Sequence, residues 1–294
     1  MNVNNRGIAV DTLPGMIVNR EYRSLLEAVG LSDFDRVYGF QGGETVKEIR
    51  ERRICRIELS SGNESRVFFL KRHKAERPPI WSGIKGLLLF RNASSGMTEF
   101  QNICDFRGAG IATAAPVAAG ERRISPLCYE SFLITESMEP FVSLERLIQC
   151  HPERFEGNGG QADKNLILRA IADLMRVMHD AGLNHLDFNA DHLMVGPGEE
   201  EDPFRLALLD FQRVDRRKWM KGRWFIKTMA ETFYTLPDPV FTETDRRFLF
   251  ERYHDRPVKS LWDRFALKWV IRKAKRIGRH TEKIIARKNA APLQ

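Results

Sequence analysis

The first part of the chain has the hydrophobic pattern of a β-sheet. β-Branched and aromatic residues gather in short runs bounded by polar residues and glycines, as in half-buried strands. Ser61-Gly62-Asn63 is typical of a hairpin turn between two of these runs. Residues 98–107 instead carry apolar positions at helical spacing and end before two glycines, which predicts one helix. The predicted strands are residues 37–40, 54–59, 66–70 and 132–135.

Beyond the last of these strands the pattern changes to that of helices. Ile167, Ile171 and Met178 recur on one face of an amphipathic segment that a glycine ends. The predicted helices are residues 166–179, 224–234, 244–253 and 261–277. We therefore predict an α+β chain with two lobes, in which residues 1–136 form a β-rich, nucleotide-binding lobe with one helix and residues 137–294 form a helical lobe.

Composition agrees with an intracellular globular protein. The chain has 294 residues, of which 43% are hydrophobic, enough to build two lobes. Its four cysteines lie far apart and lack metal-type spacing, so we expect free thiols in a reducing compartment. The first twenty residues lack a basic segment followed by an apolar one, and no apolar run approaches the roughly 18 residues of a membrane span. We expect a cytoplasmic protein, soluble or peripheral to a membrane.

Positive charge is concentrated near the C-terminus. The formal net charge is +8, and residues 246–288 alone hold fifteen Lys or Arg against four Asp or Glu. Such a face suits an anionic partner, either membrane headgroups, a phosphorylated glycolipid or nucleic acid, although a solvated helix surface would look the same. Trp262, Phe265 and Trp269 form an apolar stripe here, which we expect to pack on the helical lobe, with membrane insertion as the alternative.

Two aspartates lie 23 residues apart, each beside a short apolar segment. His185-Leu186-Asp187 opens a polar loop, and Asp210-Phe211 follows the second segment after a turn rich in Gly, Pro and Glu. This order matches the catalytic and metal loops of protein kinases. In that arrangement Asp187 orients an acceptor hydroxyl and accepts its proton, while Asp210 binds the Mg²⁺ that bridges the nucleotide phosphates.

Two histidines accompany these aspartates. We expect His185 to pack and to hold the loop by hydrogen bonds. His192 stands where a kinase has a metal-binding Asn, although imidazole is a poor ligand for Mg²⁺. It remains a candidate metal ligand, with phosphate contact or support of the loop as alternatives.

Nucleotide-binding residues are sought in the β-rich lobe. Lys71 ends a strand and suits nucleotide phosphates, and Glu99 in the predicted helix would pair with it. Arg72 and Lys74 are near enough to compete for this role. The remaining candidates are Gly42 and Gly43, in a loop that a simple turn explains equally well, and Glu136 and Met138, in a connector whose backbone would pair with adenine.

Taken in order, these segments resemble the lipopolysaccharide kinase (Kdo/WaaP) family from about residue 36 to residue 288. The resemblance implies a protein-kinase-like fold and an ATP- and Mg²⁺-dependent kinase of inner-core sugars that acts at the cytoplasmic leaflet. It gives Asp187 as base, Asp210 as metal ligand, Lys71 on phosphate and Glu99 as its partner. His192 and the basic tail are similar to the WaaP-type, heptose-phosphorylating branch.

The sequence departs from protein kinases at three positions, where Leu186, Asn189 and Gln212 replace Arg, Lys and Gly. None of these removes an expected carboxylate. The segment after Asp210 is too short for a peptide-docking activation loop, which favours a small or glycolipid acceptor. Its basic residues would suit an acidic sugar core, or are only solvated; they are Arg213, Arg216, Arg217, Lys218, Lys221 and Arg223.

We therefore predict an ATP-dependent kinase that phosphorylates heptose or Kdo in the lipopolysaccharide inner core. The predicted partner is the core glycolipid, and an anionic membrane surface is a further candidate. Nucleic acid is not expected, because no recognised motif accompanies the charge. The alternatives are a kinase of the same fold with a protein or other small-molecule acceptor, and a non-catalytic nucleotide- or membrane-binding module.

Overall fold

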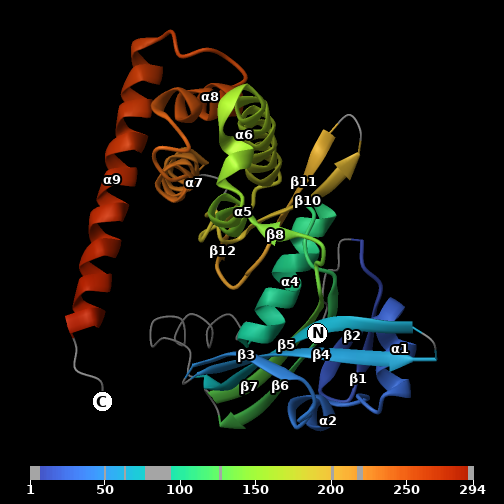
Figure 1. The fold of residues 1–294 in the computed structure, drawn as a ribbon. Helices are drawn as coiled ribbons and strands as arrows, with labels where there is room; N and C mark the ends of the chain where they lie inside the picture. The colour runs from blue at the N-terminus through green and yellow to red at the C-terminus, as the bar shows by residue number, and fades with distance from the viewer. Residues whose placement is uncertain are drawn as a thin grey trace. The chain divides into compact units, whose positions relative to one another are not determined.

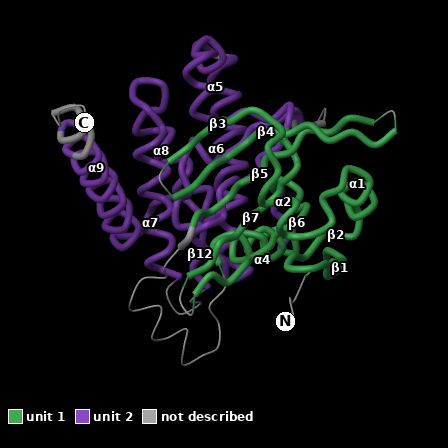
Figure 2. Tube along the Cα trace, turned by 90° about the horizontal axis from the view of Figure 1, so that it is seen from below, with its two compact units in different colours: residues 1–108, 113–138 green, residues 109–112, 139–294 purple. Residues whose placement is uncertain are grey.

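The chain folds into two compact units (Figures 1 and 2). Unit 1 comprises residues 1–108 and 113–138, and unit 2 comprises residues 109–112 and 139–294. The structure, a computed structural model, describes residues 7–49, 51–62, 64–76, 94–125, 128–199, 202–216 and 221–290. Asn63 of the predicted turn and the basic positions Arg217 and Lys218 lie outside these residues.

Unit 1 is built on an antiparallel sheet whose described strands follow the order β1-β2-β6-β7-β5-β4-β3. The long β4–β5 hairpin contains two of the predicted strands, and β7 contains a third, so these predictions are confirmed. The strands are β1 (Val10–Leu13), β2 (Met16–Asn19), β3 (Glu44–Ile49), β4 (Arg52–Ser61), β5 (Glu64–Glu76), β6 (Pro116–Ser125) and β7 (Cys128–Glu136).

The prediction of a strand at residues 37–40 was wrong, because residues 37 and 38 end helix α2 (Phe34–Tyr38) and residues 39 and 40 follow it outside any strand. Asp33 caps the helix by accepting a hydrogen bond from the Arg36 N–H, and Phe34 and Val37 are buried one turn apart. Unit 1 also contains α1 (Arg23–Ala28) and the short 3₁₀ helix η1 (Arg20–Tyr22). The expectation of one helix in this lobe was therefore also wrong.

Helix α4 (Ser95–Gly108) confirms the predicted helix and packs against β6, β7 and β5. Phe100 and Phe106 of this helix are fully buried. Gly96 allows the close approach, because a Cβ at this position would lie 2.4 Å from the backbone oxygen of Phe132 in β7. The backbone of α4 is thus held directly on the sheet, which fixes the direction of its polar side chains.

Unit 2 is mainly helical, as predicted. Helix α6 packs on α8 and α7 packs on α9. Among the described residues, two small sheets accompany the helices: β8 and β11 flank β10, and β9 pairs with β12. The helices are α5 (Leu144–Cys150), η2 (Pro152–Phe155), α6 (Gly157–Asp180), α7 (Lys221–Thr235), α8 (Glu243–His254) and α9 (Leu261–Ala290). The strands are β8 (Val142–Ser143), β9 (Asn184–His185), β10 (Leu193–Glu199), β11 (Asp202–Leu208) and β12 (Val214–Asp215).

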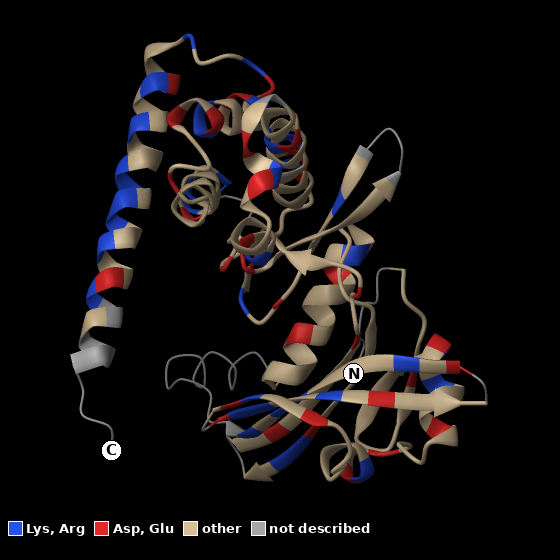
Figure 3. Ribbon diagram, viewed as in Figure 1, with Lys and Arg blue, Asp and Glu red and all other residues tan. Residues whose placement is uncertain are grey.

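The aromatic stripe of helix α9, which we expected to pack on the helical lobe, is not buried. Val270 and Ala274 are buried, whereas the side chains of Trp262, Phe265 and Trp269 are 81%, 56% and 51% exposed. The prediction that these aromatics pack on the helical lobe was wrong, because the helical repeat separates them from the face that contacts α7. Lys and Arg follow the helix beyond them (Figure 3). In the described part of the chain, no helix is both long and apolar enough to cross a bilayer.

Candidate active site

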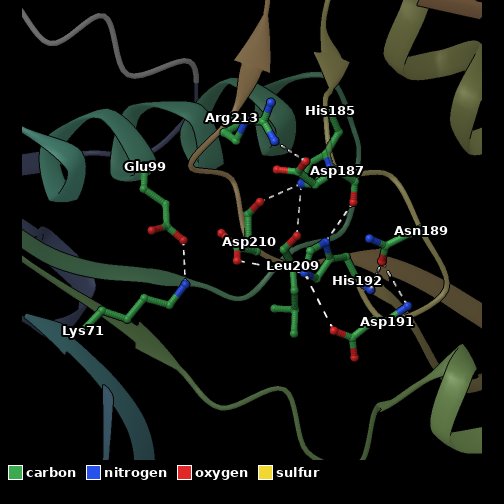
Figure 4. A network of polar contacts seen from close by, with 10 residues as sticks. All are labelled: Lys71, Glu99, His185, Asp187, Asn189, Asp191, His192, Leu209, Asp210 and Arg213. Carbon is green, nitrogen blue, oxygen red and sulfur yellow. Dashed lines mark hydrogen bonds and ion pairs between the residues drawn. The ribbon is translucent and has the colours of Figure 1, made fainter. Parts of the chain in front are cut away.

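The lysine and the glutamate predicted to form a pair in unit 1 do so. Lys71 Nζ lies 2.6 Å from Glu99 Oε1, and the two side chains are 15% and 1% exposed (Figure 4). Lys71 is held on both sides in the sheet, opposite Ile54 of β4 and Leu133 of β7. The second carboxylate oxygen of Glu99 is buried and has no hydrogen-bond partner among the described residues. A buried ion pair of this kind persists only when its surroundings hold both partners in place.

The two competing cations have other partners. Arg72 is buried and donates to the backbone oxygen of Phe40 and to Cys55 Sγ, while Lys74 forms an exposed ion pair with Glu48 at 3.0 Å. Of the three basic residues in this part of β5, Lys71 is therefore the one that the structure pairs with the carboxylate of α4.

The glycines of the predicted phosphate loop lie just before β3. Gly43 has φ +99°, and a Cβ there would lie 2.4 Å from the backbone oxygen of Arg56 in β4, so close packing requires glycine. A Cβ on Gly42 would contact the ring of Phe40. These contacts explain both glycines by packing, and their contact with phosphate stays a prediction.

The predicted adenine connector follows β7. The Glu136 carboxylate accepts a 2.6 Å hydrogen bond from the Tyr22 hydroxyl, and the Glu136 N–H donates to the backbone oxygen of Ala115. The next amide, that of Ser137, donates to Val67. Glu136 is thus held on the sheet by its side chain and backbone, and Met138 is the last residue of unit 1. Adenine pairing here also stays a prediction.

In unit 2, His185 connects the two aspartate-bearing loops. Its ring is buried in β9, and Nε2 donates to the backbone oxygens of Leu209 and Asp210 at 3.1 and 2.7 Å (Figure 4). Burial lowers the pKa of His185 to about 4, so the ring is neutral near pH 7 and the Nε2 proton is fixed by these acceptors. The ring also packs edge-on against Phe211. This is the supporting role that the sequence analysis predicted.

Asp210 has a left-handed backbone, with φ +59°. Such a conformation is uncommon for a residue other than glycine and is typical of a constrained functional position. Besides the contact with His185, the preceding amide of Leu209 donates to the backbone oxygen of His192 at 3.0 Å. The Asp210 side chain is 31% exposed.

The second histidine lies between both aspartates. His192 Nδ1 donates to the backbone oxygen of Asp187 at 2.8 Å, which directs Nε2 toward Asp210, 3.9 Å from Oδ2. Nε2 is also 3.9 Å from Asp191 Oδ2. Asn189 closes the turn, because its side-chain oxygen accepts hydrogen bonds from the amides of Asp191 and His192. His192 therefore supports the loop and also presents a nitrogen beside the candidate metal ligand.

A metal at Asp210 would depend on ligands from the substrate. In the part of the chain that the structure describes, no group of three or more His, Cys, Asp or Glu lies close enough to hold a metal ion. Mg²⁺ fits this setting, because it commonly binds through one or two carboxylates together with phosphate oxygens and water. The partly exposed Asp210 carboxylate would supply such an oxygen donor.

The carboxylate of Asp187 faces a guanidinium. Arg213 Nη1 donates to Asp187 Oδ1 at 2.7 Å, and the two side chains are 63% and 31% exposed. The Leu186 N–H donates to the backbone oxygen of Arg213, and Val214 of β12 pairs with His185 of β9. The sequence analysis listed Arg213 among the basic residues near the acceptor but did not predict this ion pair.

Helix α7 anchors the catalytic loop through residues that the sequence analysis missed. Lys227 Nζ donates to the backbone oxygen of Leu186 at 2.5 Å, and Thr235 Oγ1 accepts from the Ala190 N–H at 3.1 Å. Thr228 Oγ1 donates to the side chain of Asn184 at 2.9 Å. The available signal was a set of polar residues on one side of an otherwise apolar helix.

Comparison with known proteins shows which family the chain belongs to. The model of the lipopolysaccharide kinase (Kdo/WaaP) family matches residues 80–253, more than half of the chain. The chain belongs to this family. The predicted resemblance, the protein-kinase-like α+β fold and the phosphotransferase class are thereby confirmed. Both aspartates, the loop that joins them and the helix that anchors them lie within the matched region.

Relatives cover most of the chain. The lipopolysaccharide core heptose(I) kinase WaaP of Pseudomonas aeruginosa is 31% identical over 254 residues, which are 84% of this chain and 91% of that protein. The same enzyme of Escherichia coli K12 is 28% identical over 82% of this chain and 89% of its own length. The 3-deoxy-D-manno-octulosonic acid kinase of Actinobacillus succinogenes is 28% identical over 40% of this chain and 45% of its own length.

A solved structure shares the fold. WaaP in complex with acyl carrier protein superposes with a TM-score of 0.67 at 27% identity, over 89% of this chain and 98% of that chain.

Proposed function

We propose that this member of the family transfers the γ-phosphate of ATP to a hydroxyl group of an inner-core sugar of lipopolysaccharide, and that the sugar is heptose. The observation that carries the proposal is the pair of loops in unit 2, in which His185 and His192 hold Asp187 and Asp210 together. Heptose is favoured over Kdo because the heptose(I) kinases align over most of the chain and the Kdo kinases over 40% of it.

In this proposal Asp187 is the catalytic base. Its partly exposed carboxylate orients the acceptor hydroxyl and accepts the proton as the hydroxyl oxygen attacks the γ-phosphorus and ADP leaves. Arg213 holds the carboxylate in position before the acceptor arrives. The contact between Lys227 and the backbone of Leu186 fixes the loop on the rigid face of α7. Precise placement of the base is the main contribution that the protein makes to a reaction of this type.

Asp210 is the proposed ligand of Mg²⁺, and His192 is its neighbour on the metal side. Mg²⁺ would supply positive charge to the phosphate oxygens. The left-handed backbone at Asp210 and the hydrogen bond from His185 to its carbonyl fix the direction of the carboxylate. The Nδ1 hydrogen bond of His192 leaves Nε2 as the atom that would face a phosphate or a metal-bound water.

Unit 1 is proposed to bind the nucleotide. Lys71 would contact phosphate oxygens while Glu99 keeps its ammonium in place, as the 2.6 Å pair already does. The backbone at Glu136 and Met138 is the proposed adenine contact. Gly42 and Gly43, which lie just before β3, are the proposed phosphate contacts.

The basic face and the relatives suggest where the reaction takes place. We propose a peripheral enzyme at the cytoplasmic leaflet of the inner membrane, where its glycolipid acceptor would be available. The exposed aromatics and the following cations of α9 support this location. The solved WaaP was in complex with acyl carrier protein, so the same partner is a candidate for this chain and is added to the assay below.

The test is transfer of labelled phosphate from ATP in the presence of Mg²⁺ and acyl carrier protein. Two acceptors are compared: a dephosphorylated core that contains heptose, and a truncated core that ends at Kdo. We expect transfer to the first. Asp187→Asn should lower kcat by a factor of about 10² to 10⁴ without weakening ATP binding.

The matched control is Asp191→Asn, the same change on the same loop at a side chain that is 66% exposed. It should retain activity near that of the wild type. Full activity of Asp187→Asn would refute the assignment of the base. Transfer to the Kdo-terminated core alone would replace heptose by Kdo, and ATP binding without transfer to either core would favour another acceptor or a non-catalytic role.

A further inference from the structure

Exposed apolar side chains of the described chain are concentrated at the start of α9. Leu261, Trp262, Phe265 and Trp269 lie within nine residues, and each is more than half exposed. The other large hydrophobic side chains that are exposed in the described part are spread over β3, β6, β8, α6 and α7. Exposed apolar groups gathered in one place, rather than scattered singly, indicate an interaction surface.

Cations continue the same side of the helix toward its C-terminal end (Figure 3). The residues that share this side follow one another at intervals of three and four residues, which is the helical repeat. We name them the α9 outer face: Trp262, Phe265, Trp269, Arg272 and Arg276. The buried residues of α9 lie on the other side of the helix, which packs on α7. The outer face is thus aromatic at its start and cationic beyond it.

Carboxylates do not balance the charge of this face. Residues 264–283 hold eight Lys or Arg and one acidic residue, Glu282. Among the described residues, neither Arg272 nor Arg276 forms an ion pair with a carboxylate, and Lys268, which flanks the aromatics, forms none either. The face therefore combines apolar surface with positive charge that is open to an anionic partner.

The end of α9 that carries the aromatics is firmly capped. The Asp263 N–H donates to Ser260 Oγ at 3.1 Å, and the Ser260 N–H donates to Asp263 Oδ2 at 3.2 Å. Arg256 donates to both carboxylate oxygens of Asp263, at 2.8 and 2.7 Å. These contacts hold the first turn in place, so the aromatic side chains are presented on a preformed helix and little backbone ordering is needed when they bind.

We propose that α9 is an interfacial membrane anchor, in which the aromatic end enters an anionic bilayer and the cations that follow bind lipid phosphates. Aromatic side chains favour the boundary between headgroups and acyl chains, and anionic lipids attract cations near the surface. This inference rests on the proposed function and adds to its membrane location the element that binds, the end that enters and the lipid charge. A second copy of the chain suits the outer face less well, because it would bring the same positive charge.

The first test is cosedimentation of the full-length protein with vesicles of phosphatidylethanolamine and about one quarter phosphatidylglycerol, without ATP or acceptor. Phe265→Ser should weaken binding about tenfold, through loss of buried apolar surface. The matched control is Ile124→Ser, at a side chain of β6 that is 52% exposed against 56% for Phe265, and it should leave binding unchanged. Absence of binding by the wild type, or equal effects of the two substitutions, would overturn the proposal.

The role of the cations is tested with the double variant Arg272→Gln/Arg276→Gln. It should bind the anionic vesicles at least about tenfold more weakly than the wild type, since each cation at the surface contributes about fivefold. Arg20→Gln/Arg36→Gln removes the same net charge from exposed side chains of unit 1 and should change binding less than about threefold. Equal losses in the two double variants, or equally tight binding of the wild type to pure phosphatidylcholine vesicles, would contradict the anchor.

Tryptophan fluorescence shows whether the aromatic end enters the bilayer. Lipids that carry bromine on their acyl chains should quench part of the emission of the wild type. Trp262→Phe/Trp269→Phe should lose this quenching but keep vesicle binding within about threefold, because Phe preserves an aromatic surface. Binding of the wild type without quenching, or quenching that persists in the double variant, would refute insertion of this end.

Vesicle binding and phosphate transfer can fail separately. With a water-soluble core oligosaccharide as acceptor, Phe265→Ser should keep the kcat of the wild type, because Phe265 is not part of the candidate active site. If the wild type binds vesicles as described but transfers no phosphate, the proposed function fails and the anchor stands. If it transfers phosphate but does not bind vesicles, or if Phe265→Ser instead dissociates a dimer in analytical ultracentrifugation, the function stands and the anchor fails.

Discussion

Removal of the ammonium of Lys71 should destabilise the protein as well as inactivate it. In Lys71→Met the carboxylate of Glu99 would remain in a position where it is 1% exposed, with its second oxygen already lacking a partner among the described residues. At 2.6 Å the attraction between the two charges is about 6 kcal/mol at an effective dielectric constant of 20. Because dehydration of both groups offsets much of this, the expected loss in the free energy of unfolding is about 3–5 kcal/mol.

The assay is urea denaturation followed by fluorescence at pH 8. Lys74→Met is the matched control, the same change on the same strand at an exposed ion pair with Glu48, and it should cost about 0–1 kcal/mol. The double variant Lys71→Met/Glu99→Leu should recover most of the stability but not the activity, because it removes the buried charge and the phosphate ligand together. Equal stability of Lys71→Met and the wild type would refute the reasoning.

Three further predictions concern the rest of the molecule. Burial lowers the pKa of His179 and His185 from 6.5 to about 4, so the unfolded chain binds more protons between these values and stability is lost as the pH falls through this window. Protonation of each histidine in the unfolded chain should lower the free energy of unfolding by about 1 kcal/mol when the pH falls from 7.5 to 5.5, as measured by urea denaturation. The variant His179→Gln should show about half of the wild-type loss. No loss of stability on acidification would contradict this prediction. Gly96→Ala should cost about 1–3 kcal/mol by the same assay because its Cβ would collide with the backbone of β7, and a neutral effect would show that α4 can shift. Arg213→Gln should lower kcat about tenfold with little change in KM for ATP, because Asp187 loses the group that positions it, and Arg213→Lys should restore part of the rate in steady-state kinetics. An unchanged kcat in Arg213→Gln would show that the ion pair between Arg213 and Asp187 does not position the base during catalysis.

The parts of the site that depend on short-range order along the chain were predictable. Asp187 and Asp210 are separated by one hairpin, so their spacing alone places them at its two ends. Lys71 and Glu99 were found because a lysine after a predicted strand and a glutamate early in the next predicted helix carry opposite charges at a kinase-like interval, although β5 continues past Lys71 to Glu76. In both cases the sequence pattern and the contact share the same local elements.

Contacts between distant segments were not predictable in the same way. The loop of Asp187 is anchored by Lys227 and Thr235, more than forty residues later, and these residues are ordinary in a helix. The segment at residues 37–40 has the composition of a strand, but the Asp33 cap and two buried apolar residues one turn apart favour a helix instead. Trp269 fits a buried stripe by composition, but it lies on a different face of α9 from the buried residues Val270 and Ala274, and it is exposed.

The route of the chain between the units limits how the protein can be divided. Residues 109–112 belong to unit 2, although they lie in the sequence between α4 and β6 of unit 1. There the backbone oxygen of Ala112 accepts a hydrogen bond from the amide of Leu208, two residues before the candidate metal ligand. A recombinant fragment that begins at residue 139 would lack this tetrapeptide and would leave the Leu208 amide without its acceptor. During synthesis, likewise, Ala112 leaves the ribosome long before Leu208, so this end of the metal loop can be completed only after all of unit 1 has been made.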